Sequence, residues 1–571
     1  MTSAFRRLGR AGSAAILVFC ACSGGSGTGG AAGASGAGGS AGAGAGGSAG
    51  DAGRGGSGAS AGTSAGGSGG SAGTGGGAGN NGGGGGAGGG SGGAAGGGGT
   101  GGAGRGGSGG AAAAGGGGAT GTGGSGGAQG SGGTSGRGGA GGGGGSTGGG
   151  GTGGNPAPAW NWVGVIGTGQ SLSVGGHGNA PAMPIGATTQ RFKNLKLSLG
   201  SATVPPWDAT NAQLSMVPLV ETLRAIATGY PSPYPANIYG ESYHTAMADE
   251  ITSQVMAAQS HDYVTAHTEV GEAGQGIAAL QKGATDTGMT GRAYVASVFE
   301  VTAIARLAKA QSKSYGVGAI VLTHGESDSG SATFETDMLT LWQNYNQDLP
   351  PLTGQTTSIP MLLSQQHSEP TTAGSNSAST LAQWHIGVDH PGDFICTGPK
   401  YQYAYVNDNI HLTNPDYERL GEKYGQVFYQ RVVLGNAWQP LQPTTVERSG
   451  RVITVHFNIP VPPLTWDTTL PMPHQSAYTE WAQGRGFEVK NGATRIAINS
   501  VAISGDSVQI TCATDLPAAG LVVGYASTTD GTIRPNGTVR WGQLRDSDPF
   551  VGSLTRMAQP NYCVAFELNV P

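Results

Sequence analysis

Three short polar motifs contain residue types that can carry out nucleophilic catalysis. The first is the tripeptide Gly-Gln-Ser that ends at Ser171, and a serine hydroxyl can attack a carbonyl when a base takes its proton. The second is Asp408-Asn-Ile-His411, where a spacing of three lets the carboxylate hold imidazole Nδ1–H while Nε2 points outward as a base. The third, His-Gly-Glu-Ser-Asp, occupies residues 324–328. Together they indicate a site of the serine, histidine and aspartate type.

Each motif taken alone also fits a plain structural role. Ser171 could cap a helix, the segment 408–411 could be a polar loop that caps the next helix, and residues 324–328 could be a solvated loop. Ser173 is the weaker nucleophile candidate because it lies inside the predicted helix. A Gly-rich segment at 271–277 could lend a backbone N–H to an oxyanion. The order of the motifs along the chain therefore matters more than any single motif.

The elements that must position these motifs alternate between strands and helices. Strands are expected at 162–168, 263–270, 316–323 and 359–364, and helices at 243–255, 291–313, 332–348 and from Asn414 as N-cap with Pro415 at the first helical position. The strand at 316–323 is continuously apolar, as expected of a strand that is covered on both faces. This pattern predicts an α/β fold with a parallel sheet, in which ligands lie at the carboxyl ends of strands.

The last part of the chain shows a different periodicity. Beyond about Leu434, apolar and polar residues alternate at 453–457, 496–498, 508–510 and 564–570, and Gly, Pro and Asp separate these stretches. Such alternation is typical of antiparallel strands with one buried face. We therefore predict a small all-β sandwich domain after the α/β domain.

The order and spacing of the motifs resemble the SGNH/GDSL-like hydrolase superfamily. The resemblance lies in GQS after the first strand, GESD after a later strand and DxxHLT before the last helix, and it covers roughly Trp160 to Val433. Within the superfamily it is closest to the carbohydrate acetyl esterases that include sialate O-acetylesterases and acetylxylan esterases. The resemblance implies a flavodoxin-like fold and a serine esterase that removes acetyl or other short acyl groups from a carbohydrate.

The resemblance also implies roles for individual residues. The nucleophile falls on Ser171, the general base on His411 and the carboxylate that orients it on Asp408. Oxyanion donors fall on the N–H of Ser171, on the N–H of Gly274 and on the position of His324. The family has Gln where this chain has His324, and it has Asn or Ser where this chain has Leu172; both departures bear on substrate range. No metal and no cofactor are implied.

Three other readings remain open. A tethered glycan-binding module with an inactive hydrolase fold would lack the chemistry, although the intact Ser/His/Asp set argues against it. A lipase-type esterase of the same superfamily would prefer long acyl chains. A metal hydrolase would depend on His177, His385 and His390, which lack the tight spacing of metal ligands.

The amino-terminal region is predicted to be a targeting segment and a tether. Arg6, Arg7 and Arg10 precede a short apolar run, and the segment 1–22 resembles a lipoprotein signal with Cys22 as the lipidated residue. Most of the 116 Gly lie between residues 24 and 154, so we assign 23–155 to a disordered Gly/Ala/Ser-rich tether.

These assignments complete the predicted organisation of the chain. The esterase domain is predicted at 156–436 and the β-sandwich domain at 437–571. The protein is expected to be exported and anchored at a bacterial cell surface or outer membrane, or otherwise secreted, with an acetylated carbohydrate as partner and membrane contact only through the lipid. The part of the chain expected to fold is mildly acidic and gives no footprint for nucleic acid.

The cysteines set a limit on cross-linking. Once Cys20 and Cys22 are assigned to the signal region, Cys396, Cys512 and Cys563 remain. An odd number allows at most one pair and leaves a free thiol. Whether Cys512 and Cys563 form a disulfide is left open.

Overall fold

The structure is a computed structural model, and it describes residues 159–175, 188–198, 207–221, 223, 241–284 and 292–571. These residues belong to one compact unit. The predicted signal segment 1–22, the lipidation candidate Cys22, the tether at 23–155 and His177 lie outside the described residues and stay predictions. Within the described ranges, no helix has both the length and the apolarity needed to cross a bilayer.

A seven-stranded sheet lies at the centre of the first half of the described chain. Its strands lie in the order β3-β2-β4-β1-β5-β6-β7. Their bounds are β1 (Trp162–Gly169), β2 (Leu195–Leu197), β3 (Met216–Pro218), β4 (Thr265–Glu269), β5 (Tyr315–Thr323), β6 (Met361–Gln365) and β7 (Phe394–Pro399). Neighbouring strands run parallel except for the pair β2 and β3. Strand β1 lies between β4 and β5, so the strand order reverses beside it, which is where ligands bind in doubly wound sheets.

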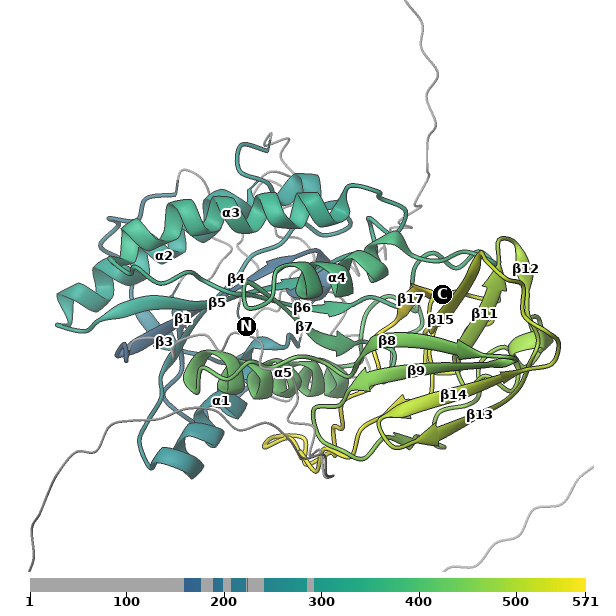
Figure 1. Ribbon diagram of the computed structural model, residues 1–571. Helices are drawn as coiled ribbons and strands as arrows, with labels where there is room; N and C mark the ends of the chain where they lie inside the picture. Colours follow the sequence, from purple (N-terminus) through teal and green to yellow (C-terminus); the bar gives the residue numbers. More distant parts are fainter. Residues whose placement is uncertain (1–158, 176–187, 199–206, 222, 224–240, 285–291) are drawn as a thin grey trace, which may run out of the picture. The chain divides into compact units, whose positions relative to one another are not determined.

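Helices cover both faces of this sheet (Figure 1). One face packs against α1 (His244–Gln259) and α5 (Asn414–Phe428), and the other against α2 (Ala293–Ala310), α3 (Phe334–Thr353) and α4 (Ala378–Asp389). The two-residue period of the strands divides the core accordingly. In β5, Ala319 and Val321 join the α1/α5 core, whereas Ile320 and Leu322 join the core on the other face. The predicted α/β fold with a covered, mainly parallel sheet is confirmed.

The structure corrects one helix end and adds elements that were not predicted. The residue at the N-cap of α5 is Thr413, which is extended, so Asn414 and Pro415 already lie inside the helix. Helix α4 was missed because it begins in the run Ser-Asn-Ser-Ala-Ser-Thr, a composition typical of loops. Strand β7 was missed because it ends in Gly-Pro, which is a turn signal.

Antiparallel strands follow in the second half of the described chain, between Gln442 and Asn569 (Figure 1). One four-stranded sheet has the order β13-β14-β9-β8, another has the order β12-β11-β15-β17, and β10 pairs with β16. Their bounds are β8 (Gln442–Ser449), β9 (Val452–Asn458), β10 (Thr465–Trp466), β11 (Phe487–Asn491), β12 (Thr494–Arg495), β13 (Ile498–Ser504), β14 (Ser507–Cys512), β15 (Leu521–Tyr525), β16 (Leu544–Arg545) and β17 (Phe566–Asn569).

Aromatic side chains join the two larger antiparallel sheets. Phe457 of β9 meets Phe487 and Phe566 of the other sheet edge to face, with ring centroids 6.4 and 6.1 Å apart. In β9, buried residues alternate with half-buried ones, as the sequence pattern predicts. The predicted β-domain after the α/β part is therefore confirmed, whereas the boundary at residue 436 stays a prediction. Cys396, Cys512 and Cys563 are all buried free thiols, so the possible Cys512–Cys563 disulfide is not formed.

Candidate active site

Ser171 lies immediately beyond the carboxyl end of the central strand. It begins a short 3-10 helix, η1 (Ser171–Ser173), where the first backbone N–H groups have no partner within the helix. The turn requires Gly169, which has φ +145°, because a Cβ there would lie 2.1 Å from the carbonyl oxygen of Thr323 on β5. The next residue, Gln170, donates its N–H to that carbonyl at 3.3 Å. Close contact with β5 therefore fixes the position of the serine.

Ser173 has a structural role in the same turn. Its hydroxyl is fully buried and donates to the carbonyl oxygens of Gln170 at 2.7 Å and Val270 at 3.3 Å. These bonds tie the turn after β1 to the loop after β4. The preference for Ser171 over Ser173 as nucleophile stays a prediction.

Asp408 and His411 lie in one tight loop between β7 and α5. Asn409 adopts φ +59°, a conformation that Asn tolerates better than most residues. One oxygen of Asp408 accepts the backbone N–H groups of Ile410 and His411, both at 2.9 Å. The loop is closed because the N–H of Val406 donates to the carbonyl of His411 at 2.8 Å. The spacing of three thus places carboxylate and imidazole on the same turn.

The structure brings Ser171, His411 and Asp408 together. His411 Nδ1 lies 2.7 Å from the second oxygen of Asp408, and His411 Nε2 lies 2.6 Å from the hydroxyl oxygen of Ser171. Because an ionised carboxylate only accepts hydrogen bonds, Nδ1 carries the proton and Nε2 is left to accept the serine proton. Partial burial by itself would raise the pKa of Asp408, but the hydrogen bonds from His411 and Ile410 outweigh it and lower the pKa to about 2.

The loops after β4 and β5 border the same turn. The N–H of Glu272 donates to the carbonyl of Gly169 at 2.9 Å, which brings the Gly-rich loop to the turn before Ser171. Gly274, two residues further on, is exposed and has φ +71°. In the loop after β5, the N–H of Ser327 donates to the side-chain oxygen of Gln170 at 3.3 Å. The role of the Gly274 N–H as an oxyanion donor stays a prediction.

His324 is held by backbone groups. Its Nδ1 accepts the N–H of Gly325 at 2.7 Å, and its Nε2 lies 3.1 Å from the carbonyl of Gln275. Complete burial lowers the pKa of this imidazole, which favours the neutral ring. The ring therefore donates to a backbone carbonyl in this arrangement, and its predicted part in the oxyanion hole stays untested.

A buried ion pair near the site was not found from the sequence. Glu326, in the third motif, contacts Lys400 at 2.5 Å, and both side chains are almost completely buried. Lys400 directly follows β7, and a polar residue at the carboxyl end of a parallel strand is the signal that could have revealed it. The pair joins the loop after β5 to the segment that leads to His411.

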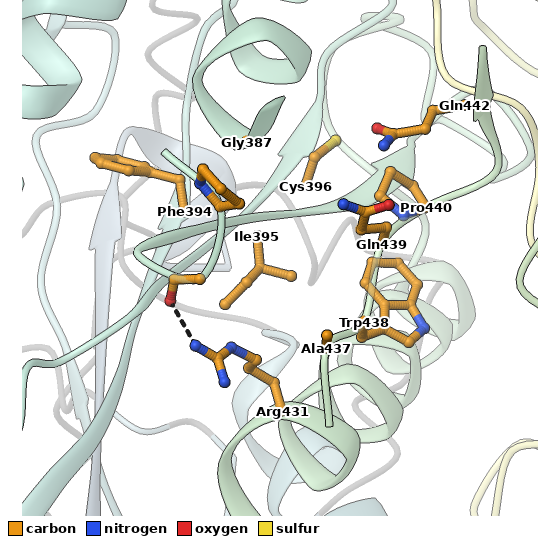
Figure 2. A pocket seen from close by; sticks show the side chains of 12 residues that line it. Gly387, Phe394, Ile395, Cys396, Arg431, Ala437, Trp438, Gln439, Pro440 and Gln442 are labelled. Atoms are coloured by element: carbon orange, nitrogen blue, oxygen red, sulfur yellow. Dashed lines mark hydrogen bonds between the residues drawn. The ribbon is translucent and has the colours of Figure 1, made fainter. Parts of the chain in front are cut away.

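A small cavity lies away from this site. Figure 2 shows it beside Phe394 and Ile395 at the start of β7, bordered by Arg431 and Trp438. Its volume is about 30 Å³, which holds water but not a sugar. It lies beside the amino end of β7, whereas Ser171 follows the carboxyl end of β1, so we assign it no part in the chemistry. Among the described residues, no group of three His, Cys, Asp or Glu side chains is arranged to hold a metal ion.

Comparisons with known proteins give low similarity. No family model matches the chain, and no curated protein matches it. Among solved structures, XAC1771, a carbohydrate acetylesterase from Xanthomonas citri, shares 12% identity at a TM-score of 0.44 and covers 71% of this chain and 80% of its own. NanS shares 10% identity at a TM-score of 0.30, covering 48% of this chain and 98% of its own. Est24, a carbohydrate acetylesterase from Sinorhizobium meliloti, shares 13% identity at a TM-score of 0.22. It covers 46% of this chain and 97% of its own.

Proposed function

We propose that this protein is a serine esterase that removes acetyl or other short acyl groups from a carbohydrate. The observation that carries the proposal is the continuous hydrogen-bonded chain from Asp408 through His411 to Ser171. Such a chain activates a hydroxyl whose own pKa is far too high for attack at neutral pH. Its location beside the point where the strand order reverses is the expected place for a substrate.

The proposed reaction has two halves. The Oγ of Ser171 forms a bond to the ester carbonyl carbon while its proton passes to Nε2 of His411. The C–O bond to the sugar then breaks, and His411 returns the proton to the departing hydroxyl. Water, deprotonated by His411, attacks the acyl-enzyme and releases the carboxylic acid with Ser171 restored. Asp408 keeps the ring oriented and stabilises its positive charge in both halves.

Two observations favour this mechanism over a passive binding role. The Ser171–His411 distance of 2.6 Å and the Asp408–His411 distance of 2.7 Å are the features that the chemistry needs. A site that only bound a glycan would need neither. The sugar and acetyl specificity come from the motif resemblance, and a lipase-type preference for long chains is the alternative for the same triad.

A labelling experiment tests the proposal directly. A fluorophosphonate should modify the wild-type protein on Ser171, as located by peptide mass spectrometry, and the protein should hydrolyse p-nitrophenyl acetate. Hydrolysis of acetyl, butyryl and octanoyl esters, together with acetylated xylan and acetylated sialic acid, then separates the acetyl esterase from the lipase-type alternative. A folded protein that is neither labelled nor active on any ester would overturn the proposal.

We further propose that the enzyme is exported and held at the cell surface by a lipid on Cys22, with the Gly-rich tether as spacer. This rests on the sequence alone. Metabolic labelling with a palmitate analogue should mark the full chain and should be lost in Cys22→Ala. Equal labelling of the variant would contradict the anchor without affecting the proposed chemistry.

A further inference from the structure

A loop of the antiparallel region lies against the segment that leads to the candidate base. This loop, residues 534–539, is closed on itself because the N–H of Gly537 donates to the carbonyl of Arg534 at 2.8 Å. The carbonyl of Asn536 accepts the N–H of Tyr405 at 2.8 Å. The guanidinium of Arg534, only 4% exposed, donates to the carbonyl of Tyr403 at 3.0 Å. The loop thus holds the backbone of the segment 403–405 at two points.

That segment in turn holds the loop that carries His411. Tyr405 forms an antiparallel bridge with Leu412. The N–H of Thr413 donates to the carbonyl of Ala404 at 3.0 Å, and the N–H of Val406 donates to the carbonyl of His411. No strand of the parallel sheet intervenes in these contacts. A shift of Tyr405 would therefore be passed directly to the backbone of residues 411–413, which includes the carbonyl of His411.

We propose that the 534–539 loop is a positioning element that sets the distance between the His411 imidazole and Ser171. This inference rests on the proposed function, since it assumes that His411 acts as the base. The C-terminal β-domain would then contribute to the chemistry through the hydrogen bonds of this loop to residues 403–405. Arg534 and Gly537 are positioning residues because they act through Tyr403 and Tyr405 and not on the substrate.

The contact at Gly537 leaves no room for a side chain. Gly537 has φ +110°, and a Cβ at this position would lie 2.3 Å from the Cβ of Tyr405. Real Cβ atoms do not approach so closely, so the loop and Tyr405 must separate in a Gly537→Ala variant. Gly505, in the turn between β13 and β14, offers a matched comparison, because it also has a positive φ of 63° but has open space around its Cβ position.

The first experiment compares Gly537→Ala with Gly505→Ala in the full chain. We expect kcat for p-nitrophenyl acetate to fall by about tenfold to a hundredfold in Gly537→Ala, because displacement of a catalytic group by about 1 Å has effects of this size. KM should change by less than about twofold, and Gly505→Ala should match the wild type. The rate of Ser171 modification by fluorophosphonate should fall in step with kcat. An unchanged kcat in a folded Gly537→Ala protein would overturn the inference.

A double-mutant cycle separates positioning from general damage. If Gly537 acts through the imidazole, its substitution should have almost no further effect on the residual rate in a His411→Ala background. An equal fold-loss in both backgrounds would overturn the inference. Arg534→Ala and Arg534→Lys cover the case in which Gly537→Ala fails to fold. Alanine should lower kcat at unchanged KM, and lysine, which retains a cationic donor, should restore part of it.

One further measurement keeps this inference apart from the proposed function. The imidazole signals of His411 in labelled protein should shift in Gly537→Ala and not in Gly505→Ala. If the wild type proves inactive while this shift is present, the proposed function fails and the loop still positions His411. If the wild type is active and the shift and the kcat loss are both absent, only the inference fails.

Discussion

The nucleophile side and the base side of the candidate site are built in different ways. Ser171 directly follows a central strand, and its turn is fixed by a neighbouring strand end and by the buried hydroxyl of Ser173. His411 lies on a loop well beyond the end of β7. That loop is hydrogen-bonded to the segment 403–405, which in turn is hydrogen-bonded to the antiparallel region. The first side is thus held within the parallel sheet, whereas the second depends on a loop of the antiparallel region.

The two sides should therefore respond differently to substitution. A residue on the nucleophile side can be changed with little effect on the base side, because the sheet itself holds the turn. A residue that supports the base side connects the β-domain to the α/β region, so its loss should affect stability as well as rate. The following predictions test that contrast, from the largest expected effect to the smallest.

The largest effect is expected on the nucleophile side. Ser171→Ala should lower ester hydrolysis by at least about a thousandfold, because losses of this order follow when a triad member is removed. Its unfolding midpoint should stay close to that of the wild type. Ser173→Ala is the matched control in the same short helix, and it should keep most of the activity while losing stability of about 1 kcal/mol for its buried hydrogen bonds. Comparable activity in the two variants would contradict the assignment.

On the base side, removal of the orienting carboxylate should be milder. Asp408→Ala is expected to reduce kcat by about a hundredfold to ten-thousandfold, with KM little changed, because the imidazole loses its fixed tautomer. The loop should also loosen, since Asp408 accepts two backbone N–H groups. Steady-state kinetics and hydrogen exchange across residues 404–413 measure both effects. A variant with normal kcat would show that the carboxylate has no part in the chemistry.

The buried ion pair between Lys400 and Glu326 should contribute to stability. Lys400→Met leaves the buried carboxylate of Glu326 without its partner, and we expect the free energy of unfolding to fall by about 3–5 kcal/mol. Arg451→Met is the control, because it breaks an exposed pair with Asp515 and should change stability very little. Denaturant titrations compare the two. Equal losses would argue against a special role for the buried pair.

The smallest predicted effect is a pH dependence within the β-domain. Burial alone would lower the pKa of His474, but the contacts with Asp530 and Glu488 outweigh it and raise the pKa to about 9. A raised pKa stabilises the fold fully below the unfolded value near 6.5 and ceases to do so as the pH rises through about 9. The stabilisation lost over that interval is at most about 3 kcal/mol.

His474→Gln should remove this part of the pH dependence. Unfolding free energies measured between pH 6 and pH 10 should fall more steeply in the wild type than in the variant. Parallel curves would mean that the imidazole is not charged in the native state.

The local chemistry could be predicted from the sequence because it depends on short spacings. The separation of three positions between Asp408 and His411 places carboxylate and imidazole on one turn, and the apolar run before Thr323 identifies a strand that must be covered on both faces. Continuously apolar strands that alternate with helices, and a period of two after about Leu434, were enough for the fold class. Helix α4 and strand β7 escaped because Ser-rich and Gly-Pro compositions are the same in loops and at the ends of elements.

Only the tertiary structure decided how these parts meet. The 2.6 Å contact between His411 and Ser171 joins residues 240 positions apart, and no local spacing encodes such a distance. The burial of Lys400 with Glu326 and the hydrogen bond from Arg534 to the carbonyl of Tyr403 likewise arise from packing between distant segments. Local sequence determined which groups can react, whereas long-range packing, which depends on shape and burial, decided how they are held in place.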